Sequence, residues 1–209
     1  MRLPTFTDLY YTNATHIGNP DLKPERALSG QLSVGYSRGR FVAGATGYYR
    51  HGTNIIDWAL VETPDGEKWK STQLTDLDTY GMEMQAVYLG GKFLRRAVLS
   101  YGTMLSDKTA EGYISRYALD YMRNKVSVQC GIGLYKGLVC EVTASWYDRK
   151  DTPEVQYAPY WLLDMRLSWS HSIFTVYAEA TNLLNSVYYD FVGLIQPSRW
   201  ISAGIVLTI

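Results

Sequence analysis

The sequence predicts an all-β protein: an antiparallel up-and-down meander of about nine strands that forms part of a transmembrane β-barrel. Three observations predict this fold. Apolar residues recur at every second position, while the period of an amphipathic helix is almost absent. Tight turns alternate with long loops along the chain, as in outer-membrane barrels. Finally, 18 Tyr and 6 Trp outnumber 5 Phe, which suits a surface where side chains meet both water and an apolar phase.

The strands follow from this alternation in chain order. We expect them at residues 27–37, 40–57, 76–89, 92–105, 121–134, 138–148, 161–170, 173–184 and 199–209. Tight turns are predicted at Arg38-Gly39, Gly90-Gly91, Tyr135-Lys136-Gly137 and His171-Ser172, and long loops at 58–75, 106–120, 149–160 and 185–198. Two-residue turns at Gly90-Gly91 and His171-Ser172 would set Tyr80 opposite Tyr101, Met82 opposite Leu99, Trp169 opposite Phe174 and Leu167 opposite Val176.

The two faces of these strands differ in polarity. Apolar residues alternate with a face that carries Glu83, Glu141, Asp164, Arg166 and Glu179. A soluble β-sandwich would show the same alternation, so it stays open as an alternative. Strand length, loop asymmetry and the rim of Tyr and Trp favour a membrane barrel, with the apolar face toward lipid.

Composition and length exclude several classes of protein. Lys plus Arg and Asp plus Glu each number 20, and this zero net charge gives no electrostatic basis for nucleic-acid binding. No segment approaches the roughly 18 apolar residues of a membrane helix. The opening MRLPTFTDLYY lacks the apolar core of a signal peptide. Cys130 and Cys140 lie in predicted strands without a CxxC motif, and can serve as small apolar residues.

An odd number of strands indicates that the barrel is incomplete. Closed bacterial barrels have even strand numbers, and an open edge would leave backbone groups unsatisfied in lipid. We therefore expect residues 1–209 to be one segment of a larger barrel, with further chain upstream.

Two separated motifs resemble those of TonB-dependent outer-membrane receptors. RLPTFTDLYY supplies Arg2, Pro4, Asp8, Leu9 and Tyr10, and GNPDLKPE follows with Asn19, Pro20, Leu22, Lys23, Pro24 and Glu25. Near the other end, NLLNSVYYDF supplies Asn182, Leu183, Leu184, Asn185 and Tyr188, with Leu184 in place of the usual Phe, before a closing strand. The resemblance implies the C-terminal part of a 22-stranded barrel that encloses a plug, the plug and earlier strands being absent here.

The resemblance also implies a function and its partners. It implies an outer-membrane receptor of a Gram-negative bacterium that takes up a scarce nutrient, such as cobalamin, siderophore-bound iron or haem, energised by TonB through the absent N-terminal region. The wording of LPTFTDLYY is most similar to cobalamin receptors. The implied partners are outer-membrane lipid, TonB, the barrel-assembly machinery and a small nutrient ligand. The alternatives are a small stand-alone barrel enzyme and the soluble sandwich.

Catalytic and metal sites are not predicted. His16, His51 and His171 are the only histidines. His171 lies in a predicted tight turn, and His51 has no evident acidic partner on its face for nucleophilic catalysis. Asp76 and Asp78 flank Leu77 at the top of a strand, so we expect both to point inward as solvated rim residues rather than as calcium ligands. We expect no enzyme activity, no cofactor and no metal.

Two sets of residues are candidates for function. Aromatic residues of the long loops and rim could form a vestibule for a ligand, or only anchor and pack the loops: Tyr10, Tyr11, Trp58, Trp69, Tyr113, Tyr157, Tyr160 and Phe191. The resemblance also suggests that the last strand is a signal to the assembly machinery, with Ser202, Gly204, Leu207 and Ile209 at the expected spacing. Ile209 departs from the usual terminal aromatic residue.

Overall fold

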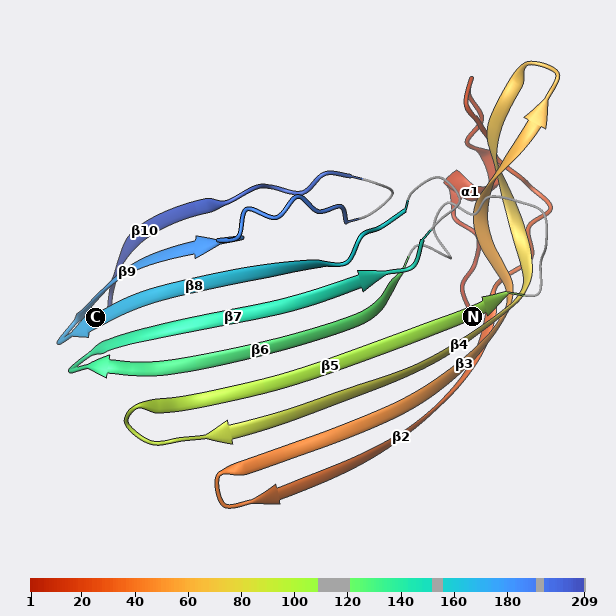
Figure 1. Ribbon diagram of the computed structural model, residues 1–209. Helices are drawn as coiled ribbons and strands as arrows, with labels where there is room; N and C mark the ends of the chain where they lie inside the picture. Colours follow the sequence, from red (N-terminus) through yellow and green to blue (C-terminus); the bar gives the residue numbers. More distant parts are fainter. Residues whose placement is uncertain (109–120, 152–155, 191–193, 209) are drawn as a thin grey trace.

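The computed structural model describes residues 1–108, 121–151, 156–190 and 194–208 as a long, curved sheet with a short helix at one end (Figure 1). The elements are α1 (Phe6–Tyr10), β1 (His16–Ile17), β2 (Arg26–Arg38), β3 (Phe41–Thr63), β4 (Gly66–Leu89), β5 (Leu94–Lys108), β6 (Met122–Tyr135), β7 (Leu138–Arg149), β8 (Tyr160–His171), β9 (Phe174–Thr181) and β10 (Trp200–Leu207). Strands β2 to β10 pair in chain order, and all these pairs are antiparallel. The predicted meander is therefore confirmed.

The described strands form a single sheet, so the sandwich alternative is wrong. The sheet is open, since β2 and β10 each pair along one side only within the described ranges. In that part of the chain no helix is both long and apolar enough to cross a bilayer.

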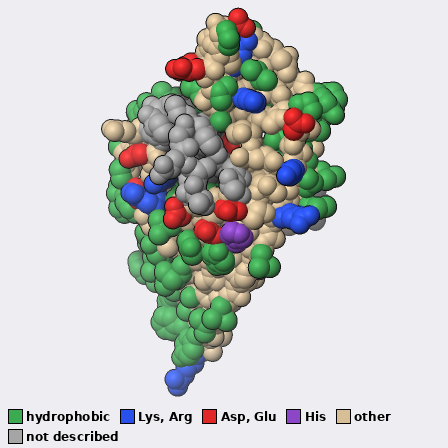
Figure 2. Space-filling view, turned by 90° about the vertical axis from the view of Figure 1, so that its right-hand side faces the viewer, with side chains coloured by type: hydrophobic (Ala, Val, Ile, Leu, Met, Phe, Trp, Pro, Cys, Tyr) green, Lys and Arg blue, Asp and Glu red, His purple; other side chains and the backbone are tan. Residues whose placement is uncertain are grey.

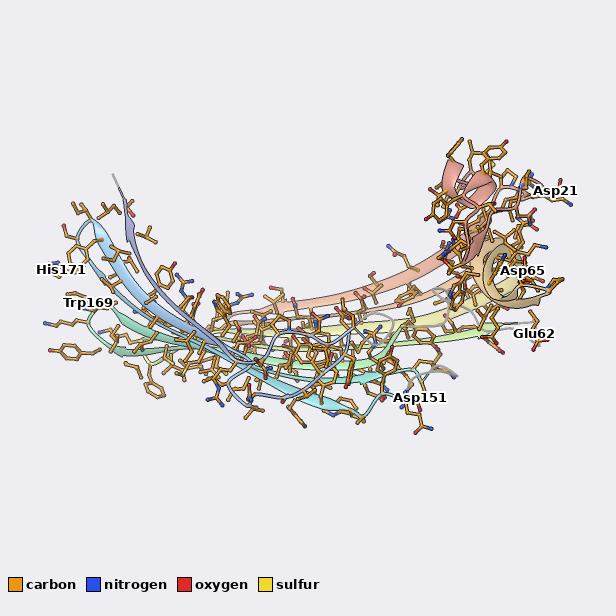
Figure 3. All side chains as sticks on the ribbon, turned by 90° about the horizontal axis from the view of Figure 1, so that it is seen from above. Asp21, Glu62, Asp65, Asp151, Trp169 and His171 are labelled. Atoms are coloured by element: carbon orange, nitrogen blue, oxygen red, sulfur yellow. The ribbon has the colours of Figure 1, made fainter. Side chains whose placement is uncertain are left out.

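One face of the sheet is apolar from edge to edge. Large exposed side chains of this outer face include Leu32 at 81%, Leu99 at 51% and Ile205 at 69% exposed. The sheet curves like a trough (Figure 3). On the opposite, inner face Val98, Ser127 and Ser145 are buried although no second layer of the described chain covers them, because side chains crowd together on a concave surface. A polar concave face and an apolar convex face are those of a membrane barrel wall.

The predicted loop at 58–75 is wrong, because β3 and β4 continue as one long hairpin. Their pairing runs on from Ile55 opposite Leu74 to Thr63 opposite Gly66, beyond a bend at Asn54, whose φ is 55°. Ile55, Ile56, Asp57, Trp58 and Ala59 are all buried. Both faces of the chain are covered here, so the period-two alternation stops, and the predicted strand ended at residue 57 instead of continuing into the hairpin.

The registers predicted for two hairpins are also wrong. Residues 90–93 connect β4 to β5, so Tyr80 lies opposite Leu105 and Met84 opposite Tyr101. The β8–β9 turn is Ser172-Ile173, so Trp169 lies opposite Val176 and Leu167 opposite Ala178. Both shifts are by an even number of residues, and the predicted face of each side chain is therefore unchanged.

Candidate functional site

The N-terminal segment is held in a compact fold by a helix cap, two ion pairs and a pair of backbone hydrogen bonds. Thr5 caps α1 and shares a capping box with Asp8. Arg2 bridges two acidic side chains: its guanidinium lies 3.4 Å from Asp8 Oδ2 and 3.2 Å from Glu25 Oε2. The main chains of Arg2 and Glu25 also exchange hydrogen bonds of 3.0 and 2.9 Å. The two halves of the N-terminal motif thus meet in space.

The N-terminal segment contacts the part of the β3–β4 hairpin that lies beyond the bend at Asn54. The Ile56 N–H donates to Glu25 Oε1 at 2.7 Å, from a buried position. Strand β1 adds a parallel bridge to β4, with His16 opposite Trp69. Leu22 is buried beside this junction at 9% exposed. We call residues 1–25 together with 55–74 the outer knob; it stands above the sheet at the end that carries the long connections (Figure 1).

Four predicted vestibule residues belong to the outer knob: Tyr11, Trp58 and Trp69 lie near its single histidine, His16, and Tyr10 is the last residue of α1. The His16 ring is 5.7 Å from the Tyr11 ring and 5.3 Å from the Trp58 ring. Trp58 is only 8% exposed and belongs to the knob's core, whereas Tyr10 and Tyr11 are 57% and 46% exposed. Tyr10 and Tyr11 are therefore accessible to solvent on the outer knob. Trp69 is half-buried and lies opposite His16.

A second aromatic group lies on the inner face near the outer ends of β7 and β8. The Tyr160 ring stacks 5.1 Å from Tyr147 and 4.8 Å from Tyr188. Lys125 Nζ lies 5.2 Å from the Tyr147 ring centre. Burial, and secondarily Asp190, raises the pKa of the Tyr188 hydroxyl, which therefore remains neutral. We call Tyr147, Tyr160 and Tyr188 the tyrosine stack.

The sequence prediction included Tyr160 but missed Tyr147 as a candidate site residue. Tyr147 follows Glu141, Thr143 and Ser145 at every second position, so its place on the polar face was readable from the alternation.

The next predicted vestibule residue along the described chain is Tyr157, which packs against an arginine side chain. Tyr157 is buried at 8% exposed and lies 5.4 Å under the Arg149 guanidinium, which pairs with Asp190 at 3.0 Å. Tyr157 therefore has a packing role, at the end of the sheet where the long connections lie. Tyr113 and Phe191 lie outside the described residues.

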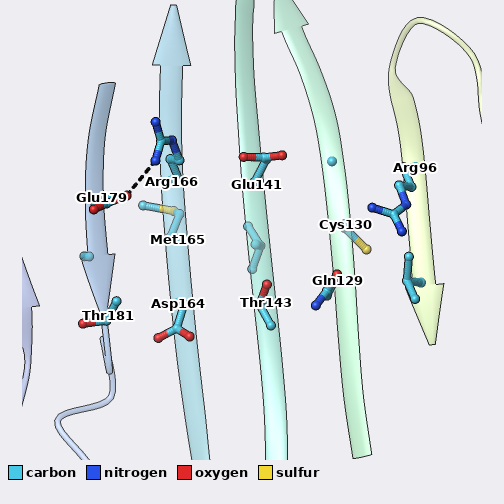
Figure 4. A pocket seen from close by; sticks show the side chains of 14 residues that line it. Arg96, Gln129, Cys130, Glu141, Thr143, Asp164, Met165, Arg166, Glu179 and Thr181 are labelled. Carbon is cyan, nitrogen blue, oxygen red and sulfur yellow. Dashed lines mark hydrogen bonds and ion pairs between the residues drawn. The ribbon is translucent and has the colours of Figure 1, made fainter. Parts of the chain in front are cut away.

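A polar recess of about 300 Å³ opens on the inner face between β5 and β9 (Figure 4). Arg166 donates to Glu179 Oε2 at 2.9 Å and lies 3.8 Å from the Tyr177 ring centre. Ser202 donates to the other Glu179 oxygen at 2.9 Å. Arg166 and Glu179, both predicted on the polar face, thus form an ion pair on the inner face.

The predicted register, with Trp169 opposite Phe174, would set Asp164 opposite Glu179, and this placement is wrong. Arg166 occupies that position, because the β8–β9 turn is displaced by one residue from the predicted one. Asp164 Oδ1 instead accepts the Asn182 N–H at 2.8 Å, at the end of β9. No repulsive carboxylate pair forms between these two acids.

Asp78 was predicted to point inward, and this too is wrong. It shares the outer face with Tyr80 and Met84, by the two-residue period of β4, and so does Asp76. Asp78 Oδ1 accepts from Tyr49 Oη at 2.7 Å and contacts His51 Nδ1 at 2.8 Å. His51 thus has an acidic partner, which the sequence analysis did not find. In the described ranges, no three His, Cys, Asp or Glu residues gather as a metal-binding group.

The candidate assembly residues lie along β10. Ser202 faces the recess, and Gly204 lies under Tyr177, while Leu207 is 64% exposed on the outer face. Ile209 is outside the described residues. Nothing in this arrangement tests recognition by an assembly machine, which stays a prediction.

Comparison with models of protein families identifies the family of this chain. The model of the TonB dependent receptor-like β-barrel matches residues 1–183. Among curated proteins, the vitamin B12 transporter BtuB of Vibrio vulnificus is 25% identical over 188 residues, which is 90% of this chain and 29% of that protein. BtuB of Photobacterium profundum is 27% identical over 128 residues, 60% of this chain and 20% of that protein. The chain thus spans under a third of the length of these relatives.

Solved structures share the fold at low sequence identity. The copper transporter OprC superposes with a TM-score of 0.79 at 13% identity, covering 99% of this chain and 35% of OprC. The ferric enterobactin receptor PfeA of Pseudomonas aeruginosa, in complex with BCV-L6, has a TM-score of 0.70 at 18% identity, covering 92% and 32%. The siderophore receptor PirA of the same organism has a TM-score of 0.69 at 15% identity, covering 98% and 34%.

Proposed function

We propose, because this chain belongs to the TonB-dependent receptor family, that it forms the C-terminal part of a 22-stranded barrel that imports a scarce nutrient. The family lies in the outer membrane of Gram-negative bacteria, and its members are receptors and transporters rather than enzymes. The enzyme alternative is therefore excluded. The remaining strands and the plug would come from chain outside residues 1–209.

The tyrosine stack is the observation that carries the binding role. Tyr147, Tyr160 and Tyr188 present aromatic rings on the inner face, where a ligand entering the barrel would pass. Stacked rings combine an apolar face with hydroxyl groups, which suits a large ligand that is partly polar. Tyr10 and Tyr11 of the outer knob would add contacts above the mouth.

Cobalamin is the first ligand to test, because both curated relatives carry the name vitamin B12 transporter. Siderophore-bound iron and haem remain the other candidates. Energy for uptake would come from TonB, acting on the region upstream of this chain. The barrel-assembly machinery would insert the barrel, and lipid would cover its apolar outer face.

Uptake by the full-length receptor tests the proposal. The receptor is expressed in a Gram-negative strain that lacks its own outer-membrane cobalamin transporter, and entry of radiolabelled cyanocobalamin is measured with and without functional TonB. We expect TonB-dependent entry. Replacing Tyr147 and Tyr160 by Ala should weaken cobalamin binding by about 10-fold or more, from loss of two ring contacts of roughly 1 kcal/mol each.

Tyr135→Ala is the matched control, because this tyrosine is 75% exposed at the opposite end of the barrel. It should leave uptake unchanged. If the receptor imports ferric siderophores or haem but not cobalamin, the ligand assignment fails and the uptake role stands. If none of the three enters in a TonB-dependent manner, the proposed function is wrong.

A further inference from the structure

Four short turns form a continuous belt at the end of the sheet opposite α1 (Figure 1). They join β2 to β3, β4 to β5, β6 to β7 and β8 to β9. Backbone hydrogen bonds connect neighbouring turns: Leu89 donates to Arg40 O at 2.8 Å, Gly133 to Phe93 O at 2.7 Å, and Ser170 to Gly137 O at 2.9 Å. Successive turns are therefore held at a fixed spacing of about 10 Å, two strand widths.

All charged side chains of these turns, histidine aside, are basic. The segments 36–43, 88–97, 134–140 and 169–175 contain no Asp or Glu. They contain Arg38, Arg40, Lys92, Arg95, Arg96 and Lys136, all of them exposed. None of these six forms an ion pair with any residue in the described ranges. Figure 2 shows Lys and Arg side chains at the lowest tip of the molecule, which is the β2–β3 turn.

Acidic residues gather at the opposite end. Asp21, Glu62, Asp65 and Asp151 lie there, far from Trp169 and His171 at the belt (Figure 3). The zero net charge of the chain therefore hides a separation of charge along the strands. Because charged groups farther apart than about 10 Å are screened in salt, these acids do not neutralise the turns.

Aromatic side chains border the basic turns on the outer face. Phe41 packs 5.0 Å from Tyr88, and Trp169 lies 5.7 Å from Phe174. Tyr36 is 58% exposed in the same row. Such aromatic residues mark the level where acyl chains give way to headgroups. Arg38, Arg40, Lys92 and Lys136 each lie one or two residues from an exposed aromatic residue, and would therefore reach the level of the lipid phosphates.

We propose that Arg38, Arg40, Lys92 and Lys136, the basic belt, bind the anionic headgroups of phospholipids in the periplasmic leaflet. Arg96 lines the inner recess and Arg95 lies beside Gly133 on the inner face, so neither belongs to the belt. Guanidinium and ammonium groups bind phosphate through charge-assisted hydrogen bonds. The belt directly adjoins the lipid-facing surface, which favours a lipid over an acidic periplasmic protein as its partner.

The inference rests on one part of the proposed function, that the chain spans the outer membrane with its short turns in the periplasm. It does not depend on which nutrient is imported. Each basic group near an anionic membrane surface contributes about a fivefold preference for that surface. A barrel with four such groups should therefore select anionic lipid from a mixture.

Native mass spectrometry of the full-length receptor tests the selection. The receptor is purified in mixed micelles with equal amounts of phosphatidylglycerol and phosphatidylcholine, and the lipids that remain bound are counted. We expect phosphatidylglycerol to be enriched at least about fivefold. The combined variant Arg38→Gln, Arg40→Gln, Lys92→Gln and Lys136→Gln should lose this enrichment. Salt at about 1 M should reduce it in the unmodified receptor, since the Debye length falls to about 3 Å.

The matched control removes four exposed cations from the other end: Lys23→Gln, Lys70→Gln, Lys150→Gln and Arg199→Gln. It should keep the enrichment. The shift in gel mobility between heated and unheated samples reports whether each variant is folded. If the combined variant does not fold, the single variants Lys92→Gln and Lys136→Gln replace it, and each should reduce the enrichment of phosphatidylglycerol. Equal binding of the two lipids by the unmodified receptor, or equal loss in belt and control variants, would overturn the proposal.

Discussion

An arginine at position 142 should destabilise the barrel far more than one at position 143. Val142 pairs with Cys130 and Met165 on the outer face, whereas Thr143 pairs with Gln129 and Asp164 on the inner face. Val142→Arg would thus put a guanidinium in lipid. Thr143→Arg would put it in the polar recess, beside a carboxylate.

The depth of Val142 sets the size of the effect. It is the fifth residue of β7, which begins at Leu138. Four steps of about 3.4 Å, projected with a tilt of about 40°, give a height of roughly 10 Å above the start of the strand. The apolar band is about 25 Å tall, so Val142 lies close to its middle, where arginine costs about 2–4 kcal/mol.

The measurement is equilibrium unfolding of the full-length receptor in lipid vesicles, with guanidinium titration followed by tryptophan fluorescence. Val142→Arg should lower the free energy of unfolding by about 2–4 kcal/mol, and Thr143→Arg by less than about 1 kcal/mol. Equal losses in the two variants would refute the assignment of faces. Both changes introduce the same side chain in place of a β-branched residue, so strand propensity, which spans about 1 kcal/mol in all, is too small to account for a difference of about 2–4 kcal/mol.

Three further outcomes are expected. Gly204→Ala should lower the free energy of unfolding by about 1–3 kcal/mol in the same titration, because its new Cβ would lie 2.6 Å from Tyr177 Oη. Gly102→Ala, whose Cβ would have no atom within 4 Å, should lower it little, and similar losses in the two variants would contradict the packing argument. Arg2→Ala should speed proteolytic cleavage of the outer knob on intact cells, since both carboxylates that it bridges lose their partner. Unchanged cleavage would show that these ion pairs do not stabilise the N-terminal segment. Deleting residues 207–209 from the full-length receptor should abolish surface exposure by antibody labelling, and normal labelling would show that the last strand is no assembly signal.

Alternation was sufficient to predict the strands whose two faces meet different surroundings. Within β6 and β7, every second residue is apolar over 126–134 and 138–146, because one face meets lipid and the other the inner recess. Both strands begin and end within one residue of the predicted bounds. The same rule failed where both faces are covered. The residues from Ile55 to Ala59 are all buried, the charged Asp57 included, so the alternation stops there and the predicted strand ended at residue 57, short of the end of the hairpin.

Long-range contacts limited the prediction of the candidate site. The motif residues Arg2 and Glu25 were identified from a resemblance, but their ion pair depends on a chain reversal that local sequence does not encode. His51 and Asp78 lie on different strands, and their contact follows only from the register of β3 on β4. Turn lengths decide register, and the four-residue turn at 90–93 could not be distinguished from a shorter Gly-Gly turn by composition alone.

The agreement between strand order and chain order has a kinetic consequence. Each strand from β3 to β10 pairs with the strand made just before it. Even the longest connection, from Thr181 to Trp200, adds only a modest entropic cost, because the cost of loop closure grows slowly with loop length. Such a sheet can grow from one edge without any earlier pairing being undone. The exception is the parallel bridge of His16 to Trp69, which spans more than 50 residues and requires the β3–β4 hairpin first. The outer knob should therefore be the slow, late step, completed only after the wall beneath it has formed.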